Sequence, residues 1–301
     1  KRMGTFKNAE KEEMDHYSEH IESAIKPECD SCDSKNDTHN DTTETIEDLT
    51  DRNADWRLEL RKSMKPKERM AIDRVKMPEL DPEYRAKTRL EEVNIGLTKE
   101  TAVKESHRCL DCANPACVEG CPVSINIPSF IKNIERENFL AAAKVLKSTS
   151  ALPAVCGRVC PQEKQCESKC VHLKMGENAV AIGYLERFAA DYERECGLRA
   201  LPEMATSNGI KVAVVGSGPS GLSFAGDMAK MGFDVYVFEA LHEIGGVLKY
   251  GIPEFRLPNK IVDVEIDNLK KMGVHFQTDC IIGKTISVKT SVYPDKEFSG
   301  R

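Results

Sequence analysis

The sequence has no apolar run long enough to cross a membrane. None of its hydrophobic stretches approaches the roughly 18 consecutive apolar residues that a spanning helix needs. The first residues, KRMGTFKNAEKEE, also lack an apolar signal-peptide core. With 40% hydrophobic and 31% charged residues over 301 positions, the composition is typical of a soluble globular chain with room for two domains. We therefore expect a cytoplasmic protein with no membrane partner.

An excess of positive charge is lacking too, which argues against nucleic acid as a partner. Residues 1–60 carry 8 Lys and Arg against 17 Asp and Glu, a net charge of −9, whereas the remainder is nearly neutral at +3. The stretch 27–55 is rich in Asp, Asn, Thr and Glu and poor in large apolar side chains, so it cannot bury enough surface to offset chain entropy. We predict that residues 1–60 form an acidic, mostly disordered tail or linker.

Strand-like alternation of apolar and polar residues is missing before Ile210. The region 61–205 instead has apolar residues at helical spacing, most clearly in a stripe over 127–147 and another over 179–192. Thr98 is a candidate N-cap for a helix that follows it. These patterns predict that residues 61–205 form an all-α domain.

A different pattern begins at residue 210 and predicts a βαβ unit. A buried strand leads into a glycine turn, a helix that ends near Gly232, and a second strand that ends at Glu239. A helix near 260–272 and a strand near 274–282 are expected next. Residues 208–301 therefore read as the first part of a Rossmann-like domain, and the chain as multidomain, α followed by α/β.

Eight of the twelve cysteines lie in two runs, which are Cys109, Cys112, Cys117 and Cys121, then Cys156, Cys160, Cys166 and Cys170. The first run reads C-x2-C-x4-C-x3-C-P, a spacing of the kind that holds cubane iron–sulfur clusters, in which the fourth cysteine often serves the other cluster. Thiolates are the soft ligands that such clusters select, and eight match two 4Fe–4S clusters in number. Zinc ribbons use two short cysteine pairs instead. We interpret the eight cysteines as reduced cluster ligands rather than as disulfides.

A glycine-rich loop follows the first strand of the βαβ unit. Its residues are Gly216, Gly218, Pro219, Ser220 and Gly221, which contain the G-x-G-x-x-G pattern in the strand-to-helix context that dinucleotide binding requires. The glycines permit a tight turn, and the helix N-terminus beginning near Pro219 offers free N–H groups to a pyrophosphate. Glu239 is placed to accept hydrogen bonds from ribose hydroxyls. Spacing alone does not distinguish FAD from NAD.

Three segments in order resemble a known family. They are HRCLDCANPACVEGCP at 107–122, CGRVCPQEKQCESKC at 156–170 and GGVLKYGIPEFRLP at 245–258. Together they resemble the small subunit of NADPH-dependent glutamate synthase. The same modules occur in the flavoprotein subunits of NADH-dependent ferredoxin:NADP oxidoreductase and in the N-terminal half of dihydropyrimidine dehydrogenase. The resemblance runs from about residue 77 to residue 286 and implies an all-α, ferredoxin-like Fe–S domain followed by a partial FAD-binding domain.

The resemblance also implies how the cysteines are shared between two 4Fe–4S clusters. One cluster would be held by Cys109, Cys112, Cys117 and Cys170, and the other by Cys121, Cys160 and Cys166. Members of the family supply the missing ligand from a Gln or Glu sixteen residues after the last cysteine, which here is Glu186. By residue chemistry alone Cys156 is the simpler candidate, because a thiolate suits iron better than a carboxylate does. Our hypothesis is that Glu186 is the ligand and Cys156 a packed thiol.

For the nucleotide, the resemblance favours FAD, with Gly245, Gly246, Val247 and Arg256 as flavin-contacting residues. No second G-x-G-x-x-G or G-x-G-x-x-A occurs, so the NAD(P)H domain of the family is missing. The ends at Lys1 and Arg301 suggest a segment of a longer chain.

We expect an electron-transfer subunit or fragment of an NAD(P)H-dependent oxidoreductase. The leading interpretation is a glutamate synthase small subunit. It would pass electrons between FAD and the clusters to a catalytic or electron-accepting protein subunit, with NAD(P)H bound by a domain of a longer chain. Alternatives are a subunit of a bifurcating ferredoxin:NADP or sulfide-type oxidoreductase, and a non-catalytic Fe–S carrier or assembly module.

Overall fold

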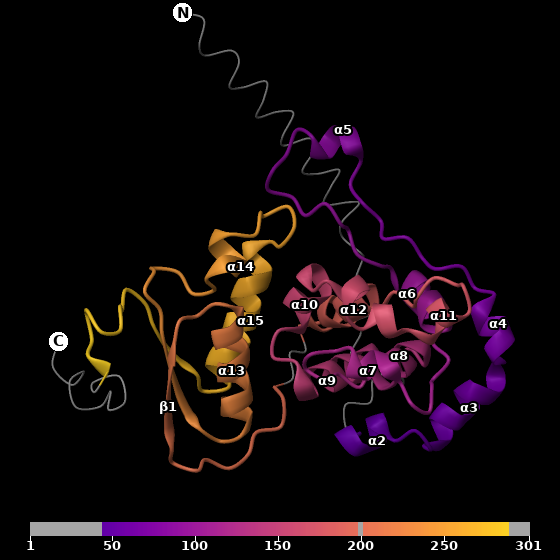
Figure 1. The fold of residues 1–301 in the computed structure, drawn as a ribbon, viewed down its shortest axis with the longest axis horizontal. Coiled ribbons are helices and arrows are strands. Elements are labelled where there is room, and N and C mark those ends of the chain that lie inside the picture. The colour runs from indigo at the N-terminus through magenta and orange to yellow at the C-terminus, as the bar shows by residue number, and fades with distance from the viewer. Residues whose placement is uncertain (1–43, 198–200, 289–301) are drawn as a thin grey trace, which may run out of the picture. The chain divides into compact units, whose positions relative to one another are not determined.

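The computed structural model describes residues 44–197 and 201–288 (Figure 1). They form a helical part, up to residue 197, and an α/β part from residue 201. Residues 1–43 of the acidic tail and the polar residues 289–301 lie outside the described ranges.

The helical part is built from short helices joined by tight turns. They are α2 (Ile46–Thr50), α3 (Asp55–Ser63), α4 (Pro66–Met70), α5 (Pro82–Arg85), α6 (Lys99–Ser106), α7 (Ala116–Glu119), α8 (Ile127–Glu135), α9 (Phe139–Thr149), α10 (Pro153–Val159), the 3-10 helices η1 (Gln162–Lys164) and η2 (Glu167–Lys169), α11 (Val171–Lys174) and α12 (Ile182–Glu195). Over residues 44–197 the one strand-like feature is an isolated bridge between Glu79 and Asn94. Thr98 accepts a hydrogen bond from the backbone N–H of Thr101, so it is the N-cap of α6, as its position in the sequence predicts.

The prediction of disorder is wrong for the described end of the tail, residues 44–60. Thr45 and Asp48 form a capping box at the start of α2, and Leu49 on this helix is 1% exposed. Arg57 on α3 is also buried, where it pairs with Asp111. Composition misled the prediction because a buried apolar side chain and long-range ion pairs, such as Arg57 with Asp111 and Glu44 with Arg136, attach this segment to the domain.

The apolar stripe over 127–147 belongs to two helices, not one. α8 ends at Glu135, and Glu137 takes a left-handed conformation with φ 62°. The side chain of Asn138 then accepts a hydrogen bond from the N–H of Ala141 and starts α9. The helical period continues through this turn, which is why the stripe alone did not reveal the break.

The core of the helical part lies between α8, α9 and α12. Phe139 on α9 meets Phe188 and Tyr192 on α12 edge to face, with ring centroids 5.1 and 4.9 Å apart. The apolar residues that predicted the helix over 179–192 therefore form the buried face of α12, which runs slightly later, from Ile182 to Glu195. Among the described residues no single helix is long and apolar enough to cross a membrane; α9 and α10 reach that length only together, across a 90° bend.

The α/β part contains the predicted βαβ unit. Its elements are β1 (Lys211–Val215), α13 (Pro219–Lys230), β2 (Asp234–Phe238), α14 (Val247–Tyr250), α15 (Asn259–Lys271) and β3 (His275–Gln277). The three strands are parallel in the order β1-β2-β3. β3 is shorter than the strand expected over 274–282.

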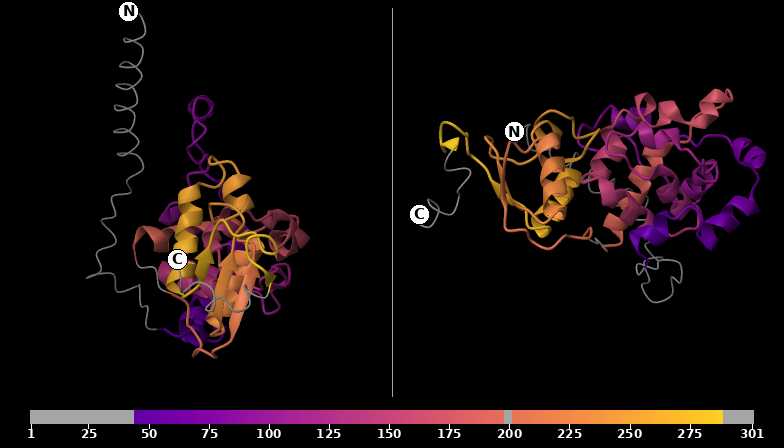
Figure 2. Two further views of the ribbon diagram at one scale, coloured as in Figure 1. Left: turned by 90° about the vertical axis from the view of Figure 1, so that its left-hand side faces the viewer. Right: turned by 60° about the horizontal axis from the view of Figure 1, so that its bottom comes forward.

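The sheet is covered by helices on one face. Figures 1 and 2 show α13 and α15 lying against the same side of the strands. On β1 the alternate residues Lys211, Ala213 and Val215 are exposed, and Val215 keeps 68% of its surface accessible. The described residues therefore bury one face of this parallel sheet and leave β1 open on the other.

The α/β part contacts the helical part through α10. Glu265 on α15 accepts a hydrogen bond from the backbone N–H of Ala154, at 2.8 Å, near the start of α10. Leu152 and Val155 belong to the same apolar cluster as residues of α13 and α15. One helix therefore begins in the core of the α/β part and leads into the second cysteine run.

Candidate metal centres and nucleotide loop

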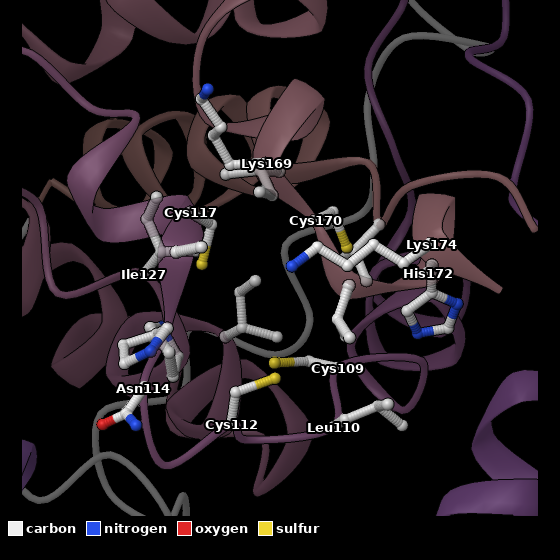
Figure 3. Close-up of a pocket in the computed structure, with 17 residues that line it drawn as sticks. Cys109, Leu110, Cys112, Asn114, Cys117, Ile127, Lys169, Cys170, His172 and Lys174 are labelled. Carbon is white, nitrogen blue, oxygen red and sulfur yellow. The ribbon is translucent and has the colours of Figure 1, made fainter.

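Four cysteines taken from both runs line one cavity of about 190 Å³. Cys109 and Cys112 follow α6, Cys117 lies in α7, and Cys170 directly precedes α11. Figure 3 shows their sulfur atoms around the same space. We call these four residues the first thiol group. They are the four that the family resemblance assigns to one cluster, and the structure brings them together although the two cysteine runs are separate.

The cavity is much larger than a single ion needs. One water requires about 10–15 Å³ by the same measure, and the lining includes the apolar side chains of Ile127, Ile131 and Val180. Within residues 44–197 and 201–288, no set of three His, Cys, Asp or Glu side chains converges closely enough for one metal ion. Four thiols around a wide, apolar space fit a polynuclear cluster held at its corners.

The turn that carries Cys109 and Cys112 is shaped by Asp111. This residue has φ 50°, a left-handed conformation that Asp tolerates better than most residues. Its buried carboxylate is held by Arg57 and Arg61, with closest N–O distances of 2.6 Å to each. Burial favours the neutral acid, but the two guanidinium groups outweigh it and hold the pKa of Asp111 below its usual value.

Three of the four thiols of the first group resist ionisation because they are buried. Burial raises the pKa of Cys109 to about 11, and it also raises the pKa values of Cys112 and Cys117. Neighbouring thiols of the group add to this effect on Cys117. Because metal ligation requires thiolates, we expect the group to release protons when it takes up a cluster.

The second thiol group consists of Cys121, Cys160 and Cys166. Cys121 follows α7, Cys160 ends α10, and Cys166 precedes η2. Burial and then the nearby carboxylate of Glu186 raise the pKa of Cys160 to about 11. Burial also raises the pKa of Cys166, and Glu167, Glu186, Cys121 and Cys160 all act in the same direction. These mutual effects place the three thiols and Glu186 in one neighbourhood.

Close packing of α10 against α12 brings Glu186 to the second group. A Cβ atom at Gly157 would lie 2.6 Å from the backbone nitrogen of Arg187, so only glycine allows this approach of the two helices. Cys156 and Cys160 therefore face the turn of α12 that carries Glu186. The structure places both candidates for the last ligand, Glu186 and Cys156, beside the second group.

The two candidates differ in their hydrogen bonds. Glu186 is 5% exposed, and its Oε1 has no hydrogen-bond partner among the described residues. Burial, and after it the charge of Glu265, raise the pKa of Glu186 to about 8. Burial and the charge of Glu186 also raise the pKa of Cys156, whereas a hydrogen bond from the Ser150 side chain acts to lower it. A buried acceptor without a partner calls for a physical explanation, and a bound metal is one such explanation.

The glycine loop leaves open space where a ligand could approach. Added Cβ atoms at Gly216 and Gly218 would meet nothing within 4 Å, and Gly216 has φ +95°. A Cβ at Gly221 would lie 2.0 Å from the carbonyl oxygen of Gly216, so this glycine lets α13 pack onto the loop. Pro219 and Ser220 begin α13 and are exposed.

The second predicted flavin segment packs onto this loop. A Cβ at Gly246 would lie 2.9 Å from the Cα of Gly218, so the Gly245–Gly246 turn and the glycine loop are in backbone contact. Val247, which begins α14, is exposed.

Arg256 is also exposed and lines a cavity of about 500 Å³ outside the glycine loop. This cavity is shared with Arg85, Arg89 and Phe255.

Glu239 is ionised and already positioned by the loop. Its Oε2 accepts hydrogen bonds from the N–H of Ser217, at 2.8 Å, and from the Ser217 hydroxyl, while Oε1 accepts one from the N–H of Leu241 at 2.9 Å. Burial disfavours its charge, but these hydrogen bonds prevail and lower its pKa.

Ser217, which the sequence analysis did not single out, connects three parts of the site. Its Oγ bonds Glu239 and accepts the N–H of Gly245 at 3.0 Å. The sequence signal that could have identified Ser217 is its position between the first two glycines of the motif.

Comparison with known families supports two functional regions. Residues 85–198 match the family described as dihydropyrimidine dehydrogenase domain II, 4Fe-4S cluster. Residues 214–275 match the family described as NAD(P)-binding Rossmann-like domain. The chain thus combines a 4Fe–4S domain with a Rossmann-like nucleotide-binding domain.

The similar proteins are oxidoreductase subunits. The NAD-dependent dihydropyrimidine dehydrogenase subunit PreT of Escherichia coli K12 is 38% identical over 201 residues, 66% of this chain and 48% of that protein. The glutamate synthase [NADPH] small chain of Halomonas elongata is 38% identical over 208 residues, 68% of this chain and 44% of that protein. The glutamate synthase [NADPH] small chain of Azospirillum brasilense is 32% identical over 213 residues, 71% of this chain and 44% of that protein. The predicted resemblance is confirmed, and the chain spans about half the length of these relatives.

Proposed function

We propose that this chain is the electron-transferring part of an NAD(P)H-dependent iron–sulfur flavoprotein oxidoreductase, built like a glutamate synthase small subunit. The observation that carries the proposal is the first thiol group, in which three cysteines of one run and the last of the other share a single cavity. The match of residues 85–198 to a 4Fe–4S domain supports the same assignment. We assign a 4Fe–4S cluster to these four thiols in an all-α, ferredoxin-like domain.

A second 4Fe–4S cluster is assigned to Cys121, Cys160, Cys166 and Glu186. The unpaired, buried Oε1 of Glu186 among these thiols supports the carboxylate as the fourth ligand. Cys156 then remains a packed thiol beside the Ser150 side chain. The apolar lining of the first group would keep water away from its cluster.

FAD is the dinucleotide proposed for the glycine loop. The open space over Gly216 and Gly218 suits a pyrophosphate at the N-terminus of α13. Glu239 accepts one described hydrogen bond at Oε1, so this oxygen retains acceptor capacity for a ribose hydroxyl. The Gly245–Gly246 turn would bound the nucleotide on its other side, with Val247 and Arg256 following in the flavin segment.

In this scheme FAD would take a hydride from NAD(P)H and release single electrons to the clusters. This chain's thiols, Glu186 and the glycine loop hold those groups, and its residues take no part in chemistry on the final substrate. NAD(P)H would bind a domain of a longer chain, and a catalytic or electron-accepting subunit would receive the electrons. The names of the relatives suggest that glutamate synthesis or pyrimidine reduction is the reaction that consumes the electrons. We place the protein in the cytoplasm, with no membrane or nucleic-acid partner.

The test of the cluster assignment is the composition of protein purified anaerobically. We expect about eight iron and eight sulfide atoms per chain, and the visible and EPR spectra of 4Fe–4S clusters. A colourless preparation loaded with zinc would overturn the assignment.

Gly218→Ala tests the nucleotide site in the same protein. Because the added methyl group meets no protein atom within 4 Å, the fold should persist while the pyrophosphate loses its place. We expect bound FAD to fall at least tenfold, with iron content and melting temperature unchanged as internal controls. Retention of FAD in this variant would contradict the site.

A further inference from the structure

A fully buried ammonium group lies beside the first thiol group. Lys132 on α8 is 0% exposed, and its Nζ donates a hydrogen bond of 2.7 Å to the carbonyl oxygen of Cys109. The same Nζ pairs with the carboxylate of Glu135, one turn further along the helix. Of the charges that act on the Cys109 thiol, Lys132 has the largest effect. Burying a lysine is costly, so its position calls for a compensating partner or a function.

Lys132 belongs to a unit of three charges with a net charge of +1. Glu135 also pairs with Arg69, at 2.8 Å, and Arg69 donates a hydrogen bond to the carbonyl oxygen of His107. Both cations therefore bind backbone oxygens next to the first ligand cysteine. Because one carboxylate serves two cations, the positive charge of this unit is not fully cancelled.

Further cations surround the same loop. Arg57 and Arg61 share the carboxylate of Asp111, and Arg52 donates a hydrogen bond to the Asp111 carbonyl oxygen. Here again the guanidinium groups outnumber the carboxylate that they bind. The backbone of the C-x2-C turn is thus held from several sides by positive charge.

The second thiol group has more balanced surroundings, because the buried cations nearest to it in the sequence, Arg158 and Arg187, both pair with Glu92 and Asp191. Among the described residues, the charges that shift the pKa values of the Cys160 and Cys166 thiols belong to carboxylates and to other thiols. Of these carboxylates, Glu167 is neutralised by an ion pair of 2.8 Å with Arg74. Glu186 is the proposed fourth ligand and carries the same charge as the thiolate that it replaces.

We propose that Lys132, with its positive charge left uncancelled by Glu135, makes the cluster of the first thiol group the more easily reduced of the two. This inference rests on the proposed function. An iron–sulfur cluster gains one negative charge on reduction, so a buried cation beside it stabilises its reduced form. One electron then leaves the cluster of the second group, which is oxidised, and enters that of the first, which is reduced. No bond breaks and no proton moves in this transfer.

Lys132 acts as a positioning and tuning residue, and two substitutions with opposite expected signs test this role. Lys132→Gln removes the positive charge and leaves the Glu135–Arg69 pair neutral, so the potential of the first cluster should fall. Glu135→Gln removes the negative charge and leaves two cations, so the same potential should rise. We expect each shift to reach at least a tenfold change in the one-electron equilibrium, which corresponds to about 59 mV.

The measurement is an EPR-monitored redox titration of the anaerobic protein with both clusters bound. Cys112→Ser, which should lose the first cluster, identifies its EPR signal. The matched control is Lys144→Gln, because Lys144 also donates to a backbone carbonyl oxygen, but to that of Glu44 and not to a cysteine of the first group. It should leave both potentials unchanged.

The inference fails if the reduction potential of the first cluster shifts in the same direction in both test variants or does not shift in either. It also fails if only the potential of the second cluster shifts. Each variant tests it independently, so a failure of one of them to load clusters leaves the other decisive. If the unsubstituted protein itself does not bind two clusters, the proposed function fails instead, and iron and sulfide analysis distinguishes the two cases.

Discussion

The two thiol groups come from the same pair of cysteine runs but differ in the charges around them. Next to the first group, cations such as Lys132 and Arg57 hold the turn that carries Cys109. Next to the second, the carboxylate of Glu186 is buried among the thiols. The difference teaches that cysteine spacing indicates which kind of metal centre a segment can hold, whereas the charges beside it come from distant segments, and by our proposal these charges tune electron uptake.

The largest expected effect is the loss of a whole cluster, and it tests whether the two thiol groups are separate sites. Cys166 and Cys170 are neighbours in the second run but lie in different groups, so Cys166→Ser and Cys170→Ser should each remove a different cluster. Each variant should lose about half of its iron, and the EPR signal that survives in one should be the signal lost in the other. Cys196→Ser, outside both groups, is the control and should retain all iron. Loss of one and the same signal in both variants would mean that the runs do not interleave.

A second pair of variants decides the composition of the second group. Glu186→Ala should lose the second cluster and about half of the iron, because it removes a proposed ligand. Cys156→Ala should keep both clusters, since its thiol remains outside the cluster. Iron analysis and EPR of the two proteins check this, and an intact pair of clusters in Glu186→Ala would exclude the carboxylate as a ligand.

A smaller effect is expected on stability, from the cations of the first group. Arg57→Met leaves the buried carboxylate of Asp111 with Arg61, which is 20% exposed, as its remaining side-chain ion pair. We expect the free energy of unfolding to fall by about 3 kcal/mol. Arg85→Met removes an exposed pair with Glu79 and should cost less than about 1 kcal/mol. Denaturant titration followed by circular dichroism measures the free energy of unfolding of both variants. Equal decreases would show that the buried ion pair stabilises the fold no more than the exposed one.

The smallest effect concerns pH and the carboxylate that joins α15 to α10. Burial raises the pKa of Glu265 from 4.5 to about 7. The folded state therefore binds this proton more tightly, so its contribution to stability is complete below pH 4.5 and is lost as the pH rises to about 7. Glu265→Gln should reduce the loss of stability between pH 5 and pH 7.5 by about 2 kcal/mol. Thermal unfolding of both proteins across this range tests the sign, and parallel pH profiles would refute it.

The βαβ unit could be predicted because its signals are local. An apolar run, the glycines of the loop and Gly232 lie within one continuous stretch, and the structure has β1, α13 and β2 where they indicated. The grouping of Cys170 with the first run came from the family resemblance, since spacing alone left all eight cysteines equivalent.

The missed features depend on residues far apart in the chain. Arg57 reaches Asp111 across 54 positions, and no local pattern shows that a helix in an acidic stretch will be fixed there. Lys132 and Glu135 lie on α8 at positions where a helical pattern would place charged residues in water, yet both are buried because they pair with each other. Ser217 was overlooked since a fingerprint of glycines says nothing about the residue between them.

The bond between Glu265 and the start of α10 also bears on the order in which the protein matures. During synthesis the chain emerges from its N-terminus, at about 5–20 residues per second. The first thiol group is complete once Cys170 has emerged, whereas the second also needs Glu186, and the contact that fixes α10 needs Glu265. Under the proposed assignment the ligands of the first group are therefore made before the last ligand of the second, and the contact that fixes α10 is made later still.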